Sequence, residues 1–228
     1  MNSTSSYTVW FGDQSDCIDP DSIRGQICPI FNNFPVKNII FQHQVHKTHG
    51  HAVNVDTLEL YKRSLVHDGD FLITNIPGVA VGVLTADCLP IAIADVTHKA
   101  VGIVHAGWRG TVGGIVRVAL EHMQKLYGTQ VSDVKIYCGS CAHVCCYQVD
   151  QVFIQKLPDW AKPALVLRDQ VYYFDLLACN ILLLNSLGIK NKQIDTSLSK
   201  CTICTNEFCS YRRNPGTYAR QMSIIWVN

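Results

Sequence analysis

The 228-residue sequence contains no long hydrophobic run. Its longest apolar stretches, around residues 79–83 and 182–184, fall far short of the roughly 20 residues that a helix needs to cross a bilayer. The first ten residues are polar and lack the basic and apolar regions of a secretory signal. We therefore expect a soluble, cytoplasmic protein with no membrane partner.

An excess of charge of either sign is also absent. The chain has 19 Lys and Arg residues against 18 Asp and Glu residues, which gives a formal net charge of +1, and only 16% of its residues are charged. Proteins that bind nucleic acids usually carry a clustered basic surface, whereas the basic residues of this chain are scattered. The composition therefore gives no support to a nucleic-acid partner, and the 48% of hydrophobic residues predicts a sizeable core.

Cysteine, in contrast, is abundant, with 11 residues. The count is odd, and the chain is long and lacks a signal, so we expect reduced thiols rather than a disulfide framework. Some thiols should pack in the core as small hydrophobic groups. The pairs Cys138-x-x-Cys141 with Cys145-Cys146, and Cys201-x-x-Cys204 with Cys209, leave a second, structural zinc site open. Their separation is longer than in a zinc ribbon, and packing is the simpler explanation.

The apolar pattern predicts a mixed α/β fold. Short β-branched runs without alternation are typical of strands buried on both faces, and apolar spacing of three and four predicts helices. Because strands and helices do not alternate strictly, we expect mixed sheets with helices outside. The expected strands are 38–42, 52–56, 69–74, 79–84, 89–95, 100–105, 134–138 and 222–226, and the expected helices are 110–126, 151–157 and 176–187.

Polar, reactive residues follow two of the expected strands. Cys88 lies in Thr-Ala-Asp-Cys-Leu-Pro after one strand, and His105 ends the other in Val-His-Ala-Gly-Trp-Arg-Gly. Strand ends can present side chains at a surface cleft. Taken alone, each residue is better explained as a buried core group. A pair of such residues together with Gln44-Val45-His46, however, offers the neutral and thiolate ligands that suit zinc, with a fourth position free for water or substrate.

The same segments carry a resemblance to a known family. Gln-Val-His, Thr-Asn-Ile-Pro-Gly-Val, Thr-Ala-Asp-Cys-Leu-Pro and Val-His-Ala-Gly-Trp-Arg-Gly occur in the order found in the YfiH, or laccase-domain, family. The block 145–149 (Cys-Cys-Tyr-Gln-Val) and the closing segment 201–221 resemble it too. The similarity runs from about Lys37 to the end of the chain, whereas residues 1–36 diverge.

This resemblance implies one catalytic domain over residues 1–228, with a layered α/β/β/α fold similar to the catalytic domain of the cytotoxic necrotizing factors. It implies a metal site of His46, Cys88 and His105 that holds zinc, with copper as the alternative. It further implies a purine nucleoside phosphorylase that converts adenosine, inosine and methylthioadenosine, with phosphate, to free base and ribose 1-phosphate, and that deaminates adenosine as a side activity. The divergent start leaves open whether an N-terminal arginine lines the pocket.

Residue chemistry suggests roles beside the metal. Arg109, Arg212 and Arg213 are candidates for binding phosphate, because the planar guanidinium donates paired hydrogen bonds. Tyr211 is a candidate for stacking on the purine. For deamination, an activated water would attack the purine C6 and an acid must move protons; Asp87 is the nearest acid, although in an extended segment its side chain points away from that of Cys88.

Two other functions remain open. A cysteine hydrolase would use Cys88 as nucleophile and His105 as base on an amide or a peptidoglycan precursor, and a non-catalytic metal-binding regulatory module would keep the fold without the chemistry. A true multicopper oxidase is disfavoured, because His49-x-His51 is the only His-x-His pair. We expect a monomer or a small homo-oligomer.

Overall fold

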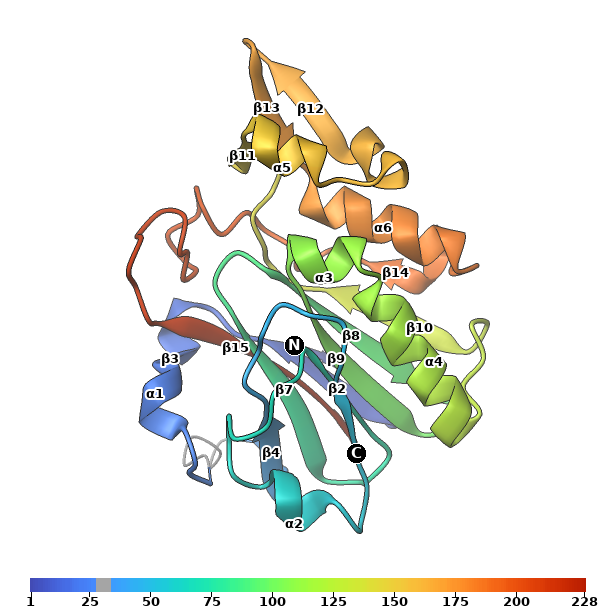
Figure 1. Ribbon diagram of the computed structural model, residues 1–228. Helices are drawn as coiled ribbons and strands as arrows, with labels where there is room; N and C mark the ends of the chain where they lie inside the picture. The colour runs from blue at the N-terminus through green and yellow to red at the C-terminus, as the bar shows by residue number, and fades with distance from the viewer. Residues whose placement is uncertain (28–33) are drawn as a thin grey trace.

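Two mixed sheets form the centre of the molecule in the computed structural model, which describes residues 1–27 and 34–228 (Figure 1). The first sheet has the order β1 (Asn2–Ser3), β2 (Tyr7–Phe11), β15 (Arg220–Val227), β7 (Val79–Thr85) and β4 (Asn38–Phe41), and β3 (Cys17–Ile18) also pairs with β15. The second has the order β14 (Ile194–Asp195), β10 (Val134–Cys138), β8 (Leu89–Asp95), β9 (Ala100–Ala106), β6 (Phe71–Thr74) and β5 (His51–Val53). Each sheet combines parallel and antiparallel pairs, as expected.

The two sheets pack face to face. Val81 and Ile225 of the first sheet share one core with Leu72 and Ile103 of the second. Every residue of β7, β8 and β9 is buried, because each of these strands is covered on both faces. This explains why their sequences read as continuous apolar runs rather than as alternating ones.

Helices cover the outer faces of both sheets. On the second sheet lie α3 (Trp108–Val112), α4 (Ile115–Tyr127) and α6 (Leu176–Ser186), and α4 packs Ile115, Ala119 and Met123 into that core. Figure 1 shows the short α1 (Pro20–Ile23) at the opposite side of the molecule, where Ile23 joins the core on the outer face of the first sheet. The layered α/β/β/α arrangement is confirmed; the similarity to the necrotizing factor domain stays a prediction.

The helix expected at 110–126 is wrong as a single element. It is divided into α3 and α4, because Gly114 has a φ of 83° and serves as the N-cap of α4. This left-handed conformation is open to glycine at little cost. α3 follows directly on β9 and carries Trp108 and Arg109 at the end of that strand.

A small third sheet was missed by the sequence pattern. Its strands are β11 (Gln148–Val149), β13 (Val171–Phe174) and β12 (Leu165–Arg168), and the β12–β13 hairpin projects from one end of the molecule (Figure 1). Asp169 and Gln170 form its turn with φ values of 47° and 63°. Positive φ at both turn residues is typical of Asn-Gly or Asp-Gly, so Asp-Gln carries no hairpin signal. The short helices α2 (Leu58–Tyr61) and α5 (Gln151–Gln155) complete the fold.

The expectation of reduced thiols is wrong for one pair, because Cys17 and Cys209 form a disulfide. The two residues are 192 positions apart. β3 pairs with β15 at the register Cys17↔Gln221, and the Gln221 side chain accepts a hydrogen bond from the Cys209 backbone N–H. The pairing of β3 with β15 therefore brings the two cysteines together. A contact between residues so far apart in the chain cannot be predicted from a local sequence pattern.

Over the described part of the chain, none of the helices combines the length and the hydrophobicity needed to span a bilayer. The expected cytoplasmic location and the monomeric or small oligomeric state stay predictions.

Candidate metal centre and its pocket

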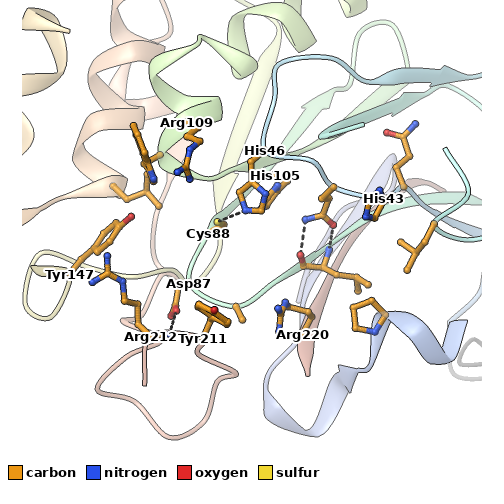
Figure 2. Close-up of a pocket in the computed structure, with 18 of the residues that line it drawn as sticks. His43, His46, Asp87, Cys88, His105, Arg109, Tyr147, Tyr211, Arg212 and Arg220 are labelled. Atoms are coloured by element: carbon orange, nitrogen blue, oxygen red, sulfur yellow. Dashed lines mark hydrogen bonds between the residues drawn. The ribbon is translucent and has the colours of Figure 1, made fainter. Parts of the chain in front are cut away.

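Three predicted ligands converge at one end of the second sheet. In the antiparallel β8–β9 pair, Pro90 lies opposite His105, so Cys88, just before β8, lies beside the end of β9. His46 comes from the loop between β4 and β5. The ligand atoms of His46, Cys88 and His105 all lie within 4.8 Å of one another, and Cys88 Sγ is 3.9 Å from His46 Nε2. Figure 2 shows this sulfur facing the imidazoles.

A buried carboxylate that the sequence analysis missed holds this cluster together. Asp70 Oδ1 accepts hydrogen bonds from His105 Nδ1 at 2.8 Å and from the His46 backbone N–H at 2.9 Å. Its Oδ2 accepts from the backbone N–H groups of Val45 at 3.3 Å and Lys47 at 2.8 Å. His46 has a φ of 59°, a conformation that non-glycine residues rarely adopt without such support. Asp70 therefore fixes both histidines at once.

The electrostatics of the cluster favour a thiolate. Burial raises the pKa of the Cys88 thiol, but the His105 and His46 imidazoles outweigh it and lower the pKa to about 6. Burial likewise lowers the pKa of His105, while the Cys88 thiolate and the Asp70 carboxylate raise it to about 9. Burial raises the pKa of Asp70 as well, but the His105 hydrogen bond and charge, with the backbone donors, hold it below its usual value.

The donor set fits a transition-metal ion. Two imidazoles and one thiolate are ligands for zinc or copper, and three protein ligands are typical of a catalytic rather than a structural site. A carboxylate on the far nitrogen of a histidine ligand, as Asp70 is on His105, is the usual outer partner of such sites. The space is also tight: a Cβ on Gly107 would lie 2.9 Å from Cys88 Sγ and 3.2 Å from His46 Cδ2.

The cluster opens into a pocket of about 530 Å³. Four arginines from different segments line it: Arg24 after α1, Arg109 on α3, Arg212, and Arg220 at the start of β15. Figure 2 shows three of them around the metal cluster. Arg24 supplies an arginine from the divergent N-terminal region, and neither it nor Arg220 was a sequence candidate. Tyr211 lies in the same lining and is 52% exposed.

The four guanidinium groups differ in how far the protein already engages them. Arg212 donates to the Gln148 carbonyl and lies over the Tyr147 ring, Arg220 donates to two carbonyls, and Arg24 donates to Leu65. Arg109 rests on the Trp108 ring, 4.6 Å from its centroid. No acceptor within the described ranges takes a hydrogen bond from its guanidinium, so its donors are available to a ligand.

Two sequence candidates have structural partners instead. The Asp87 carboxylate accepts from the Thr202 hydroxyl at 2.6 Å. It also accepts from the Arg212 backbone N–H at 2.7 Å (Figure 2). Asp87 thus joins the loop before β8 to the C-terminal loop, and its φ of 88° belongs to this junction. Arg213 lies outside the pocket lining. Its guanidinium donates to carbonyl groups of the same C-terminal loop, at Thr202, Ile203, Thr205 and Phe208.

The chain is similar to several known proteins over most of its length. A purine nucleoside phosphorylase of Borreliella burgdorferi is 32% identical over 166 residues, which cover 70% of this chain and 69% of that protein. Purine nucleoside phosphorylase YlmD of Geobacillus stearothermophilus is 35% identical over 166 residues, covering 68% of this chain and 59% of YlmD. The crystal structure of the Bacillus licheniformis hypothetical protein YfiH matches with a TM-score of 0.78 at 26% identity, over 97% of this chain and 93% of that one.

The model of one protein family matches residues 12–228, which include the three clustered ligands and the four pocket arginines. The chain therefore belongs to the family described as multi-copper polyphenol oxidoreductase laccase.

Proposed function

We propose that the protein is a metal-dependent purine nucleoside phosphorylase that acts on adenosine, inosine and methylthioadenosine and deaminates adenosine as a side activity. The observation that carries this proposal is the placement of a His–Cys–His cluster in a pocket with four arginines, one of which has free donors. The names of the relatives support the same activity.

In phosphorolysis, a phosphate oxygen forms a bond to C1′ of the ribose while the C1′–N9 bond breaks. The bonding electron pair leaves with the purine, which takes up a proton. Arg109 suits the attacking phosphate, because its unengaged guanidinium can give two parallel hydrogen bonds to phosphate oxygens. Arg212 and Arg220 would add positive charge from other sides of the pocket. They would also help to hold the dianion close to the sugar, where effective concentration lowers the barrier.

His46, Cys88 and His105 would hold the metal, with zinc as our first assignment and copper as the alternative. When bound, such an ion supplies Lewis-acid chemistry to an oxygen or nitrogen of the substrate. The protein's own part is to keep His105 in one tautomer: Asp70 accepts from Nδ1, so Nε2 is left free to act as the ligand atom.

Tyr211 would bind the purine. Its ring is half exposed in the pocket lining, and an aromatic face is a sequence-independent platform for a base. Asp87, by contrast, already accepts two hydrogen bonds. We therefore propose that Asp87 positions the Cys88 loop and the Arg212 loop rather than moving protons in deamination.

The test is product analysis by chromatography. Metal-loaded protein is incubated with adenosine or inosine, with and without phosphate, beside the variants His46→Ala and His49→Ala. His49 is an exposed neighbour outside the metal cluster, so it is a matched control. Phosphate-dependent release of free base that is lost in His46→Ala and kept in His49→Ala supports the proposal. Release that is indifferent to phosphate, or equal in both variants, contradicts it.

A cysteine hydrolase is the second candidate, because Cys88, His105 and Asp70 are also arranged as a nucleophile, a base and an orienting carboxylate. The two functions differ in how Cys88 reacts. A ligand thiolate is shielded while metal is bound, whereas a nucleophile is alkylated at the same rate in metal-loaded and chelator-treated protein. Equal rates, followed by turnover of an amide substrate without metal, would favour the hydrolase.

A further inference from the structure

Four cysteines gather at a second place, separate from the metal centre. Cys145 and Cys146 lie in the turn that precedes β11, and Cys201 and Cys204 lie in the loop between β14 and β15. Their four sulfur atoms all lie within 4.8 Å of one another. We propose that Cys145, Cys146, Cys201 and Cys204 bind a second metal ion, zinc, as a closed structural site.

The spacing of the sulfurs fits a tetrahedral site. Four thiolates at about 2.3 Å from a zinc ion lie about 3.8 Å from one another. Cys145 Sγ and Cys204 Sγ are 3.8 Å apart, and no pair exceeds 4.8 Å. Disulfides would join these residues two at a time and leave no reason for all four to converge, whereas one soft ion accounts for the whole cluster. Four thiolates select zinc over hard cations such as magnesium or calcium.

Packing does not explain these cysteines. Cys145 and Cys204 are exposed and Cys146 is half-buried. The thiols that serve as core groups are others, Cys138 and Cys179 among them. An exposed thiol contributes little burial energy, so the convergence of two exposed cysteines with two more points to a ligand rather than to core formation.

The backbone holds the Cys201 loop beside the segment that leads to Cys145 and Cys146. The Cys141 N–H donates to the Lys200 carbonyl and the Thr202 N–H donates to the Cys141 carbonyl, so the two segments run side by side. An isolated parallel bridge pairs Cys141 with Cys201. The convergence of the four sulfur atoms therefore rests on a paired backbone and not on loose loops.

The site would brace one wall of the pocket. Cys146 directly precedes Tyr147, which lies under the Arg212 guanidinium at 4.8 Å. Cys201 directly precedes Thr202, whose hydroxyl donates to Asp87. A metal that ties these two segments together would therefore fix the placement of Tyr147 and of Asp87, and through them the Arg212 loop. This role is independent of which reaction the pocket performs.

Metal counting on the intact chain tests the proposal. The full-length protein, purified with zinc and a thiol reductant, is analysed by native mass spectrometry beside Cys145→Ser/Cys204→Ser and, as the matched control, Cys88→Ser. We expect two zinc ions per wild-type chain, one in the double variant and one in Cys88→Ser. A single zinc that Cys88→Ser removes and the double variant keeps would overturn the proposal.

A second measurement needs no variant. The wild-type chain is alkylated with and without zinc, and the modified cysteines are identified by peptide mass spectrometry. The proposal predicts that zinc protects Cys145, Cys146, Cys201 and Cys204 together and that a strong chelator exposes them together. Equal alkylation of Cys145 and Cys204 in both conditions, or a Cys145–Cys204 disulfide that persists in reductant and excludes zinc, would overturn it.

Discussion

Asp70 positions both histidines of the metal centre, so its replacement tests how that centre is held together. Each of its carboxylate oxygens accepts two hydrogen bonds, Oδ1 from His105 and His46 and Oδ2 from Val45 and Lys47. In Asp70→Asn the side chain keeps its shape, but one oxygen becomes an NH₂ group. Turned toward Val45 and Lys47, that NH₂ faces two N–H donors, and two hydrogen bonds are lost. Turned toward His46 and His105, it keeps one bond only if the imidazole takes the tautomer that protonates Nε2, the metal-ligand atom.

The magnitude follows from those two bonds. A hydrogen bond to a buried charged group contributes about 1.5–3 kcal/mol, so we expect the free energy of unfolding to fall by about 3 kcal/mol or more. Loss of an outer partner of a metal ligand typically weakens metal binding about 10- to 100-fold. Zinc affinity of the His–Cys–His site is measured by competition with a chromophoric chelator, and stability by urea denaturation of the metal-free protein.

Asp68→Asn is the matched control. It makes the same chemical change two residues away, at an exposed carboxylate that accepts from His43 outside the metal cluster. We expect its zinc affinity and stability to equal those of the wild type. If the zinc affinity of Asp70→Asn stays within about threefold of that of Asp68→Asn, then Asp70 does not position the metal ligands.

Three further predictions concern the same region. In metal-free protein the alkylation rate of Cys88 should rise with pH through a midpoint near 6. The reason is that the pKa of the Cys88 thiol in the folded protein is lowered from 9.0 to about 6, and the reactive thiolate is present above that pH. Peptide mass spectrometry measures the rate at each pH, and a midpoint above 8 contradicts the prediction. Gly107→Ala should weaken zinc binding while the fold persists, since the new Cβ would press on Cys88 Sγ and His46; unchanged affinity in the chelator competition would show that the site is not tight. Arg213→Ala should lower the free energy of unfolding by about 1–3 kcal/mol, because the carbonyl groups that accept from this guanidinium lose their partner. The KM for phosphate should stay near that of the wild type. A raised KM for phosphate together with wild-type stability would show that Arg213 acts in the pocket.

The sequence predicted the centre of the fold well, because the strands there are buried on both faces. β7, β8 and β9 have continuous apolar runs, so the pattern predicted their positions and drew attention to Cys88 and His105 at their ends. His46 needed the family resemblance. It lies in a loop whose shape depends on hydrogen bonds to Asp70, 24 positions away, and loop geometry of that kind leaves no periodic trace.

Other parts of the site were beyond sequence reasoning for similar reasons. The segment His-Asp-Gly-Asp-Phe contains the exposed Asp68 and the fully buried Asp70. The one signal in the sequence that could separate them is that Asp70 comes directly before an apolar strand. Arg24 reaches the pocket because β3 and α1 follow the pairing of the chain ends. The same pairing brings Cys17 to Cys209. A separate pairing, between the segments at Cys141 and Cys201, brings Cys201 beside Cys145 and Cys146.

We propose that the arginine-lined metal pocket transfers the ribosyl group of a purine nucleoside to phosphate. Phosphorus NMR of inorganic phosphate and adenosine, incubated with the zinc-loaded protein, follows that transfer directly. We expect the phosphate signal to decline while a ribose 1-phosphate signal grows, at the same rate as free base is released. Free base with unchanged phosphate, or no reaction at any metal loading while the Cys88 thiolate stays reactive toward amide substrates, would contradict it.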